Sequence, residues 1–181
     1  MGYYISMHIT KRYIHLNSRY KDNRDEKSWN FLYTLPFFIE NVVAIRLNSI
    51  EIVPGNADDH PNGVLNSTAS KATKSFFFCL DDYTNNEKDK HIVCLDKNRV
   101  LNEKVLGKVQ IYDTDNTKII SSGFESKENV LERLYQNRYN LQRFRVKLFD
   151  EEGEPLTVHD GNDETLNDFT FTLEVDVIDG I

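Results

Sequence analysis

The side chains best suited to metal chemistry are the histidines, and their spacing does not match a metal site. The five, His8, His15, His60, His91 and His159, are scattered along the chain with no ligand-type spacing between them. Asp58-Asp59-His60 could bind a cation weakly, but a solvated loop explains this stretch more simply. We therefore expect no metal, no other cofactor and no enzymatic activity.

Two acidic stretches resemble parts of calcium loops. Asp113-Thr114-Asp115-Asn116 matches the start of such a loop, but Lys118 and Phe124 occupy the positions that require glycine and glutamate, which excludes an EF-hand. Residues 160–164 are acidic enough to hold Ca²⁺, although a turn explains them equally well. The chain also lacks the nucleophile-elbow, P-loop and dinucleotide glycine patterns.

The two cysteines, Cys79 and Cys94, each lie in an apolar run, and the polar residues 81–90 between the runs indicate a hairpin connection. In a paired hairpin both thiols could face the same side. Free cysteine is usually a small core residue, so we expect buried, reduced thiols rather than a reactive pair.

The charge distribution argues against nucleic-acid binding and is uneven along the chain. The 181 residues, enough for one domain, carry a net charge of −7, whereas DNA and RNA binders need a basic face. Residues 1–30 hold six Lys/Arg and three Asp/Glu, while residues 148–181 hold eleven acids and no Lys/Arg. This asymmetry favours head-to-tail contact of identical copies, a basic arm against an acidic edge; two solvated termini of opposite sign are the alternative.

Contact with a membrane is expected to be indirect at most. No apolar run approaches the ~20 residues that span a bilayer, and the N-terminus lacks the order of a secretory signal. Gly2 formally matches a myristoylation pattern, but the bulky Tyr3 and Tyr4 that follow it argue against acylation.

Alternation of apolar and polar residues is the dominant pattern and predicts an all-β fold. In the clearest case Trp29, Phe31, Tyr33 and Leu35 share one face, and Pro36 is expected to end that strand. The eight predicted strands cover residues 13–17, 28–35, 42–53, 74–80, 91–95, 108–112, 142–149 and 169–177. Their largest expected core residues are Trp29, Phe31, Tyr33, Phe76, Phe78, Phe144, Phe169 and Phe171.

Three segments depart from this pattern. Residues 126–138 place Val130, Leu131, Leu134 and Tyr135 at helical spacing and predict one short inserted helix. Residues 55–71 are rich in Asn, Asp, Ser and Gly, contain almost no large apolar residue and predict a long surface loop. Residues 1–12 show no clean alternation and predict an N-terminal arm.

Basic and aromatic residues interleave near the N-terminus. Such a composition is typical of single-strand nucleic-acid platforms, but in an acidic domain it favours docking on a neighbouring subunit. The candidate subunit-interaction residues are Tyr3, Tyr4, Lys11, Arg12, Arg19 and Tyr20.

Several stretches resemble the small single jelly-roll capsid proteins of large eukaryotic (nucleocytoplasmic) DNA viruses. The resemblance covers about a third of the chain, in residues 13–23, 29–36, 39–52, 144–150 together with Gly153, and 168–174. It implies a single eight-stranded jelly roll with two facing sheets, built into a capsid beside a double jelly-roll major capsid protein. One departure is the polar continuation after Val53, where relatives carry Pro, Asn and an aromatic cluster.

The expected function is therefore a structural virion protein, most simply the penton protein that forms homopentamers at icosahedral vertices. Such a protein is assembled in the host cytoplasm and resides in the virion. A minor capsid or cement protein is the first alternative, and a β-sandwich that binds carbohydrate or peptide through residues 55–71 is the second. A cupin-type enzyme is the third, because jelly rolls host all of these functions.

Overall fold

The computed structural model describes residues 8–20, 22, 30–52, 75–84, 91–94, 100–110, 112–113, 119–122, 132–155 and 169–179. Nearly all of these residues lie in antiparallel strands, so the described part of the chain is all-β. The exceptions include a 3₁₀ turn, η1 (Ser18–Tyr20). The strands are β1 (His8–Asn17), β2 (Asn30–Ile52), β3 (Ser75–Asp81), β4 (His91–Cys94), β5 (Val100–Glu103), β6 (Val105–Gln110), β7 (Tyr112–Asp113), β8 (Ile119–Ser122), β9 (Arg133–Asp150) and β10 (Phe169–Asp179).

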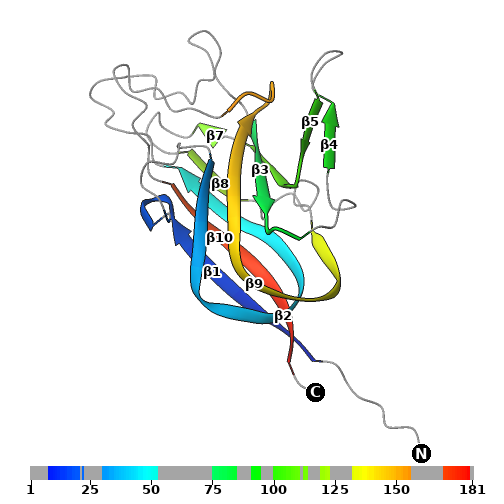
Figure 1. Ribbon diagram of the computed structural model, residues 1–181. Coiled ribbons are helices and arrows are strands. Elements are labelled where there is room, and N and C mark those ends of the chain that lie inside the picture. The colour runs from blue at the N-terminus through cyan, green and yellow to red at the C-terminus, as the bar shows by residue number, and fades with distance from the viewer. Residues whose placement is uncertain are drawn as a thin grey trace, which may run out of the picture.

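The main sheet is curled, and its strands form two rows (Figure 1). In the first row β1 pairs with β10, β10 with the second half of β2, and that half with β8. In the second row the first half of β2 pairs with β9, β9 with β3, and β3 with β6. The short strand β7 extends the first row beyond β8, and β4 and β5 form a separate hairpin.

Two long strands turn the corner between the rows, and both do so through extra residues in the ladder. From Thr34 to Ile39 the β2 chain advances five positions while its partners on β9 advance two, from Arg143 to Leu141. Pro36 falls inside this bulge, where its missing N–H costs no ladder hydrogen bond. Both strands bend sharply at this end of the sheet (Figure 1).

The β9 chain turns the same corner a few residues away. Between its pairings with Val42 and Ala44 of β2, β9 advances from Tyr139 to Leu134, five positions against two. Asn41 lies at the corner in the left-handed region with φ 58°, and its N–H donates to the side-chain oxygen of Asn140 at 3.2 Å. Asparagine tolerates this backbone conformation better than most residues.

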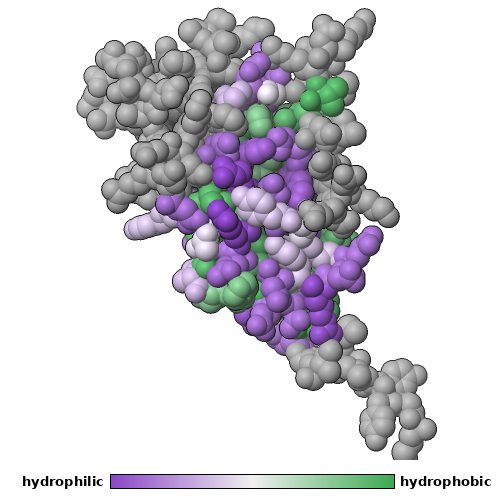
Figure 2. All heavy atoms as spheres, in the orientation of Figure 1, coloured by the Kyte–Doolittle hydropathy of each residue, from purple (hydrophilic) through white to green (hydrophobic). Residues whose placement is uncertain are grey.

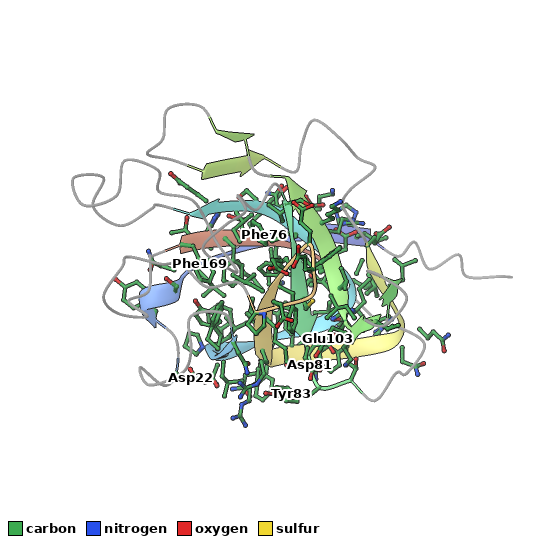
Figure 3. The ribbon with its side chains drawn as sticks, turned by 90° about the horizontal axis from the view of Figure 1, so that it is seen from above. Asp22, Phe76, Asp81, Tyr83, Glu103 and Phe169 are labelled. Atoms are coloured by element: carbon green, nitrogen blue, oxygen red, sulfur yellow. The ribbon has the colours of Figure 1, made fainter. Side chains whose placement is uncertain are left out.

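Inward-facing side chains of both rows fill the core with aromatic rings. Phe31 packs edge-on against Tyr33, with ring centroids 5.5 Å apart, and Phe171 contacts both Tyr33 and Phe78. Phe76 and Phe169 lie between the layers when the sheet is seen end-on (Figure 3). These rings connect strands from both rows, so burial of their apolar surface holds the curled sheet closed.

The opposite face of the second row carries a smaller apolar cluster. Phe77, Cys79 and Phe149 point away from the main core and are covered with the help of Leu101 from β5. Burial raises the pKa of the Cys79 thiol far above its ordinary value, with Glu103 adding to the effect. The thiol is therefore a small buried hydrophobic group, as expected from the sequence.

Several sequence-based predictions need correction. The predicted helix over residues 126–138 is wrong for residues 133–138, because these belong to β9. Leu134, which was expected on the apolar side of the helix, is 61% exposed. The apolar residues had a helix-like spacing because the bulge in β9 interrupts the alternation of apolar and polar residues there. Residues 8–12 belong to β1 rather than to an arm, since their backbone pairs with β10.

Two further predictions fail for reasons of connectivity. Pro36 does not end a strand, because β2 continues through the bulge. Within the described residues, β3 and β4 are not a pair: β3 lies between β6 and β9, and β4 pairs with β5. In the turn after β9, Gly153 has φ 79°, a conformation that glycine adopts without steric cost. Trp29 and the loop at residues 55–71 lie outside the described residues.

Two substitutions on β9 test this burial pattern. Phe144→Ala should lower the free energy of unfolding by about 3–5 kcal/mol, because it empties a fully buried site in the core. Leu134→Ala should change it by no more than about 0.5 kcal/mol, as at other exposed positions. Urea unfolding measures both. A large loss in the Leu134 variant would instead favour the helix with Leu134 in the core.

Candidate functional site

Two of the three basic residues predicted to dock on a neighbour, Lys11 and Arg12, are paired with acids of the same chain. Lys11 Nζ forms an ion pair and hydrogen bond with Glu174 of β10. Arg12 approaches Asp179 to 3.6 Å, and the Thr10 hydroxyl also donates to Asp179. The antiparallel pairing of β1 with β10 thus brings the basic start of the described chain against its acidic end.

This pairing extends into a charge network across three neighbouring strands. Arg46 of β2 donates to Glu174 at 3.0 Å and to Asp176 at 2.8 Å, and it also pairs with Glu132. The hydrogen bond to Glu174 raises the pKa of Lys11, while that to Asp176 does the same for Arg46. Single exposed pairs contribute little, but a network of this kind fixes the register of the strands more firmly.

The remaining predicted interaction residues are not brought together into one site. Tyr20, at the end of η1, is exposed. Arg19 lies in the same turn, but its side chain is outside the described part, as are Tyr3 and Tyr4. Asp22, a little further on, covers the edge of β2: its backbone N–H donates to the Leu32 carbonyl, and its carboxylate accepts from the backbone N–H and hydroxyl of Thr34.

The most developed polar centre was not predicted from the sequence and lies just after β3, at Asp82. This side chain is fully buried. Its Oδ1 accepts hydrogen bonds from the Thr84 hydroxyl at 2.7 Å and from Lys104 Nζ at 3.2 Å. Its Oδ2 accepts from Arg133 Nη1 at 3.1 Å and from the Tyr135 hydroxyl at 2.5 Å. Two cations and two hydroxyls therefore surround one carboxylate.

Further contacts tie the same centre to the corner of β9. The Tyr139 hydroxyl donates to the Asp82 carbonyl at 2.5 Å, and the Tyr135 and Tyr139 rings stack with centroids 5.2 Å apart. Arg133 Nη2 also donates to the Lys104 carbonyl at 3.2 Å. Asp82 thus joins three segments distant in sequence: the end of β3, the turn between β5 and β6, and the bent start of β9.

The electrostatics of this centre suit a structural role. Burial alone would raise the pKa of Asp82, but the Arg133 guanidinium and the hydrogen bonds from Tyr135 and Thr84 outweigh it and hold that pKa well below its ordinary value. Burial and the nearby Asp82 charge raise the pKa of Tyr135. The carboxylate stays ionised and the phenol stays neutral, so neither group is poised to exchange protons near neutral pH.

Tyr83, next to Asp82, has an unusual backbone for an aromatic residue. Its φ is 60°, and its N–H donates to Asp81 Oδ1 at 3.0 Å. Its side chain is exposed on the outer side of the second row, near Asp81 and away from the core (Figure 3). The Arg143 guanidinium lies 5.8 Å from the centroid of the ring, within range of a cation–π contact.

Among the described residues, no group of three or more His, Cys, Asp or Glu side chains is placed to hold a metal ion. The ring nitrogen Nδ1 of His15 hydrogen-bonds the Thr172 hydroxyl at 2.8 Å, which gives this histidine a place in the β1–β10 contact. No helix in the described part is long and apolar enough to cross a bilayer.

Comparison of the sequence with protein families and with curated proteins finds no match. The resemblance to single jelly-roll capsid proteins therefore remains a prediction that rests on the stretches of sequence near the two ends of the chain.

Removing the charge of Asp82 tests the buried centre. Asp82→Asn should lower the free energy of unfolding by about 3–5 kcal/mol at neutral pH, because Arg133 then loses its buried counter-charge and Lys104 keeps only the more exposed Asp81. Glu40→Gln, an exposed change of the same kind at the corner of β2, is the control and should have little effect. Chemical denaturation measures both free energies of unfolding. An Asp82→Asn variant as stable as the wild type would contradict the stabilising role of the buried carboxylate.

The pH dependence gives an independent check. Because the folded-state pKa of Asp82 lies below its ordinary value of 3.8, its ionised form stabilises the fold above that pH. This contribution is lost as the pH falls below 3.8 toward the lowered pKa. The stability gap between the wild type and Asp82→Asn should therefore narrow in acid, measured by denaturation at stepwise lower pH; a gap that stays constant in that range would exclude the linkage.

Proposed function

We propose that the chain is a single jelly-roll structural protein of a virus capsid, most simply the penton subunit that closes icosahedral vertices as a homopentamer. Ring closure then depends on heterologous contacts, with one surface of each copy meeting a different surface of the next. No side chain is assigned a catalytic step in this proposal.

The pairing order of the strands carries the proposal. A jelly roll is an antiparallel ribbon of eight segments rolled up so that segment one pairs with eight, two with seven, three with six and four with five. If β2 is divided at its corner, β1 pairs with β10, the first half of β2 with β9, the second half with β8, and β3 with β6. These are the four pairs that the rolled ribbon requires.

The contacts between those pairs support the same assignment. Rolling the ribbon places segment eight beside three and segment seven beside four, and β10 does pair with the second half of β2, as β9 does with β3. The β4–β5 hairpin is then an insertion between the fourth and fifth segments. The strand pairing alone supports a capsid role but does not select it, because the same architecture serves lectins and cupins. The resemblance of residues 13–23, 29–36 and 39–52 to capsid proteins favours the capsid role over these two.

The native mass of the purified chain tests the proposal. Mass photometry or sedimentation at rising concentration should give a pentamer of the 21.2 kDa chain. A chain that stays monomeric but binds assembled capsids would instead favour the minor or cement role. A monomer or dimer with measurable glycan affinity and no capsid binding would contradict a structural role in the virion.

A further inference from the structure

We propose that one surface of this protein, formed by Phe37, Phe38, Tyr83 and Arg143 and here called the aromatic–arginine patch, binds the acidic surface of a second copy. The inference rests on the proposed function, because it names a contact through which the ring would close. It differs from the basic N-terminal arm expected from the sequence.

The first two members are apolar side chains that the bulge of β2 presents to solvent. Phe37 and Phe38 are 61% and 56% exposed, although they lie within a long strand. The bulge that carries them sits between the β2 positions paired with Arg143 and Leu141, so it lies beside the other half of the patch. A small hydrophobic area is visible over the bend of β2 in a largely hydrophilic face (Figure 2). Bulges commonly re-aim side chains in this way.

The Tyr83 ring is held in place by a backbone that a bulky residue rarely adopts. A positive φ at an aromatic residue is unfavourable and persists only where its surroundings enforce it. Here the Asp81 side chain accepts the Tyr83 N–H, and the neighbouring Asp82 is locked into the buried polar centre. The strain keeps the ring exposed under Arg143, and such outliers cluster where a surface makes a contact.

The charge of Arg143 indicates the partner. Among the described residues no carboxylate lies within ion-pair distance of its exposed guanidinium, whereas Lys11, Arg12 and Arg46 are each paired with one or more acids. A second copy supplies the opposite charge, because its net charge of −7 means that it has more carboxylates than the Lys and Arg side chains of the same copy can neutralise. Exposed Phe, Tyr and Arg together also match the composition of protein–protein hot spots.

Two disruptive variants and two matched controls test the inference by sedimentation velocity across a concentration series. Arg143→Glu and the double variant Phe37→Ser/Phe38→Ser should each raise the concentration at which pentamers dissociate by about tenfold or more, as expected for hot-spot residues. Arg138→Glu makes the same charge change at another exposed position of β9, outside the residues that form the patch, and Leu134→Ser removes an equally exposed apolar side chain. Both controls should assemble like the wild type.

The outcomes separate this inference from the function on which it rests. Pentamers that dissociate at unchanged concentration in both disruptive variants would overturn the patch and leave the proposed function standing. Equal losses in Arg138→Glu and Arg143→Glu would overturn it too, because the effect would then be one of overall charge. A wild-type chain that remains monomeric at high concentration would overturn this inference and the penton assignment, whereas binding of that monomer to assembled capsids would still leave a minor structural role in the virion. Circular dichroism and the unfolding midpoint, expected to stay near the wild-type values, show that the variants are folded.

Discussion

The architecture depends on two strands, β2 and β9, that each belong to both rows of the sheet. Because they are shared, the rows cannot separate without breaking the ladders of these strands, and the aromatic core between the rows is closed at the corner. The corner needs extra residues in both strands, since uninterrupted pairing would extend one row of strands and would not turn the sheet into the second row. Bulges supply these residues, and the Asp82 centre holds the β9 side of the corner through Arg133, Tyr135 and Tyr139.

The same constraint decides which surfaces are left for partners. Pairing of β1 with β10 uses Lys11 and Arg12 to neutralise Glu174 and Asp179, so the uneven charge of the sequence is largely balanced inside the molecule. The corner has the reverse effect. It exposes Phe37 and Phe38 and leaves Arg143 beside them without a carboxylate among the described residues. Folding thus moves the candidate docking surface from the N-terminus to the bend of the sheet.

Much of the fold could be predicted from alternation, because side chains that face the core recur every second residue along a strand. The predicted core residues Phe31, Tyr33, Phe78, Phe144 and Phe171 are all buried. Prediction failed where alternation is interrupted: the β9 corner resembled a helix, and Pro36 resembled a strand end. The short strands β5 and β8 were missed, because each places two apolar residues before two polar ones and so shows no alternation.

The polar centre could not have been found from the sequence. Asp82, Lys104 and Arg133 are separated by more than twenty residues each, and single charged residues carry no local sign of burial. Only the pairing of β3 with β6 and β9 brings them together. The one available signal was the pair Asp81 and Asp82 at the end of a mainly apolar strand, which indicates a turn as readily as a buried anion.

The rolled pairing of the strands can be measured directly by nuclear Overhauser contacts between backbone protons in the 181-residue chain. Cross-strand contacts are expected between β1 and β10 near Ile14 and Leu173, and between the two halves of β2 and their separate partners, with Phe31 opposite Val146 and Ile50 opposite Ser121. Helical contacts over residues 133–138, or pairing of β3 with β4 in place of β9, would contradict the rolled sheet and the function proposed from it.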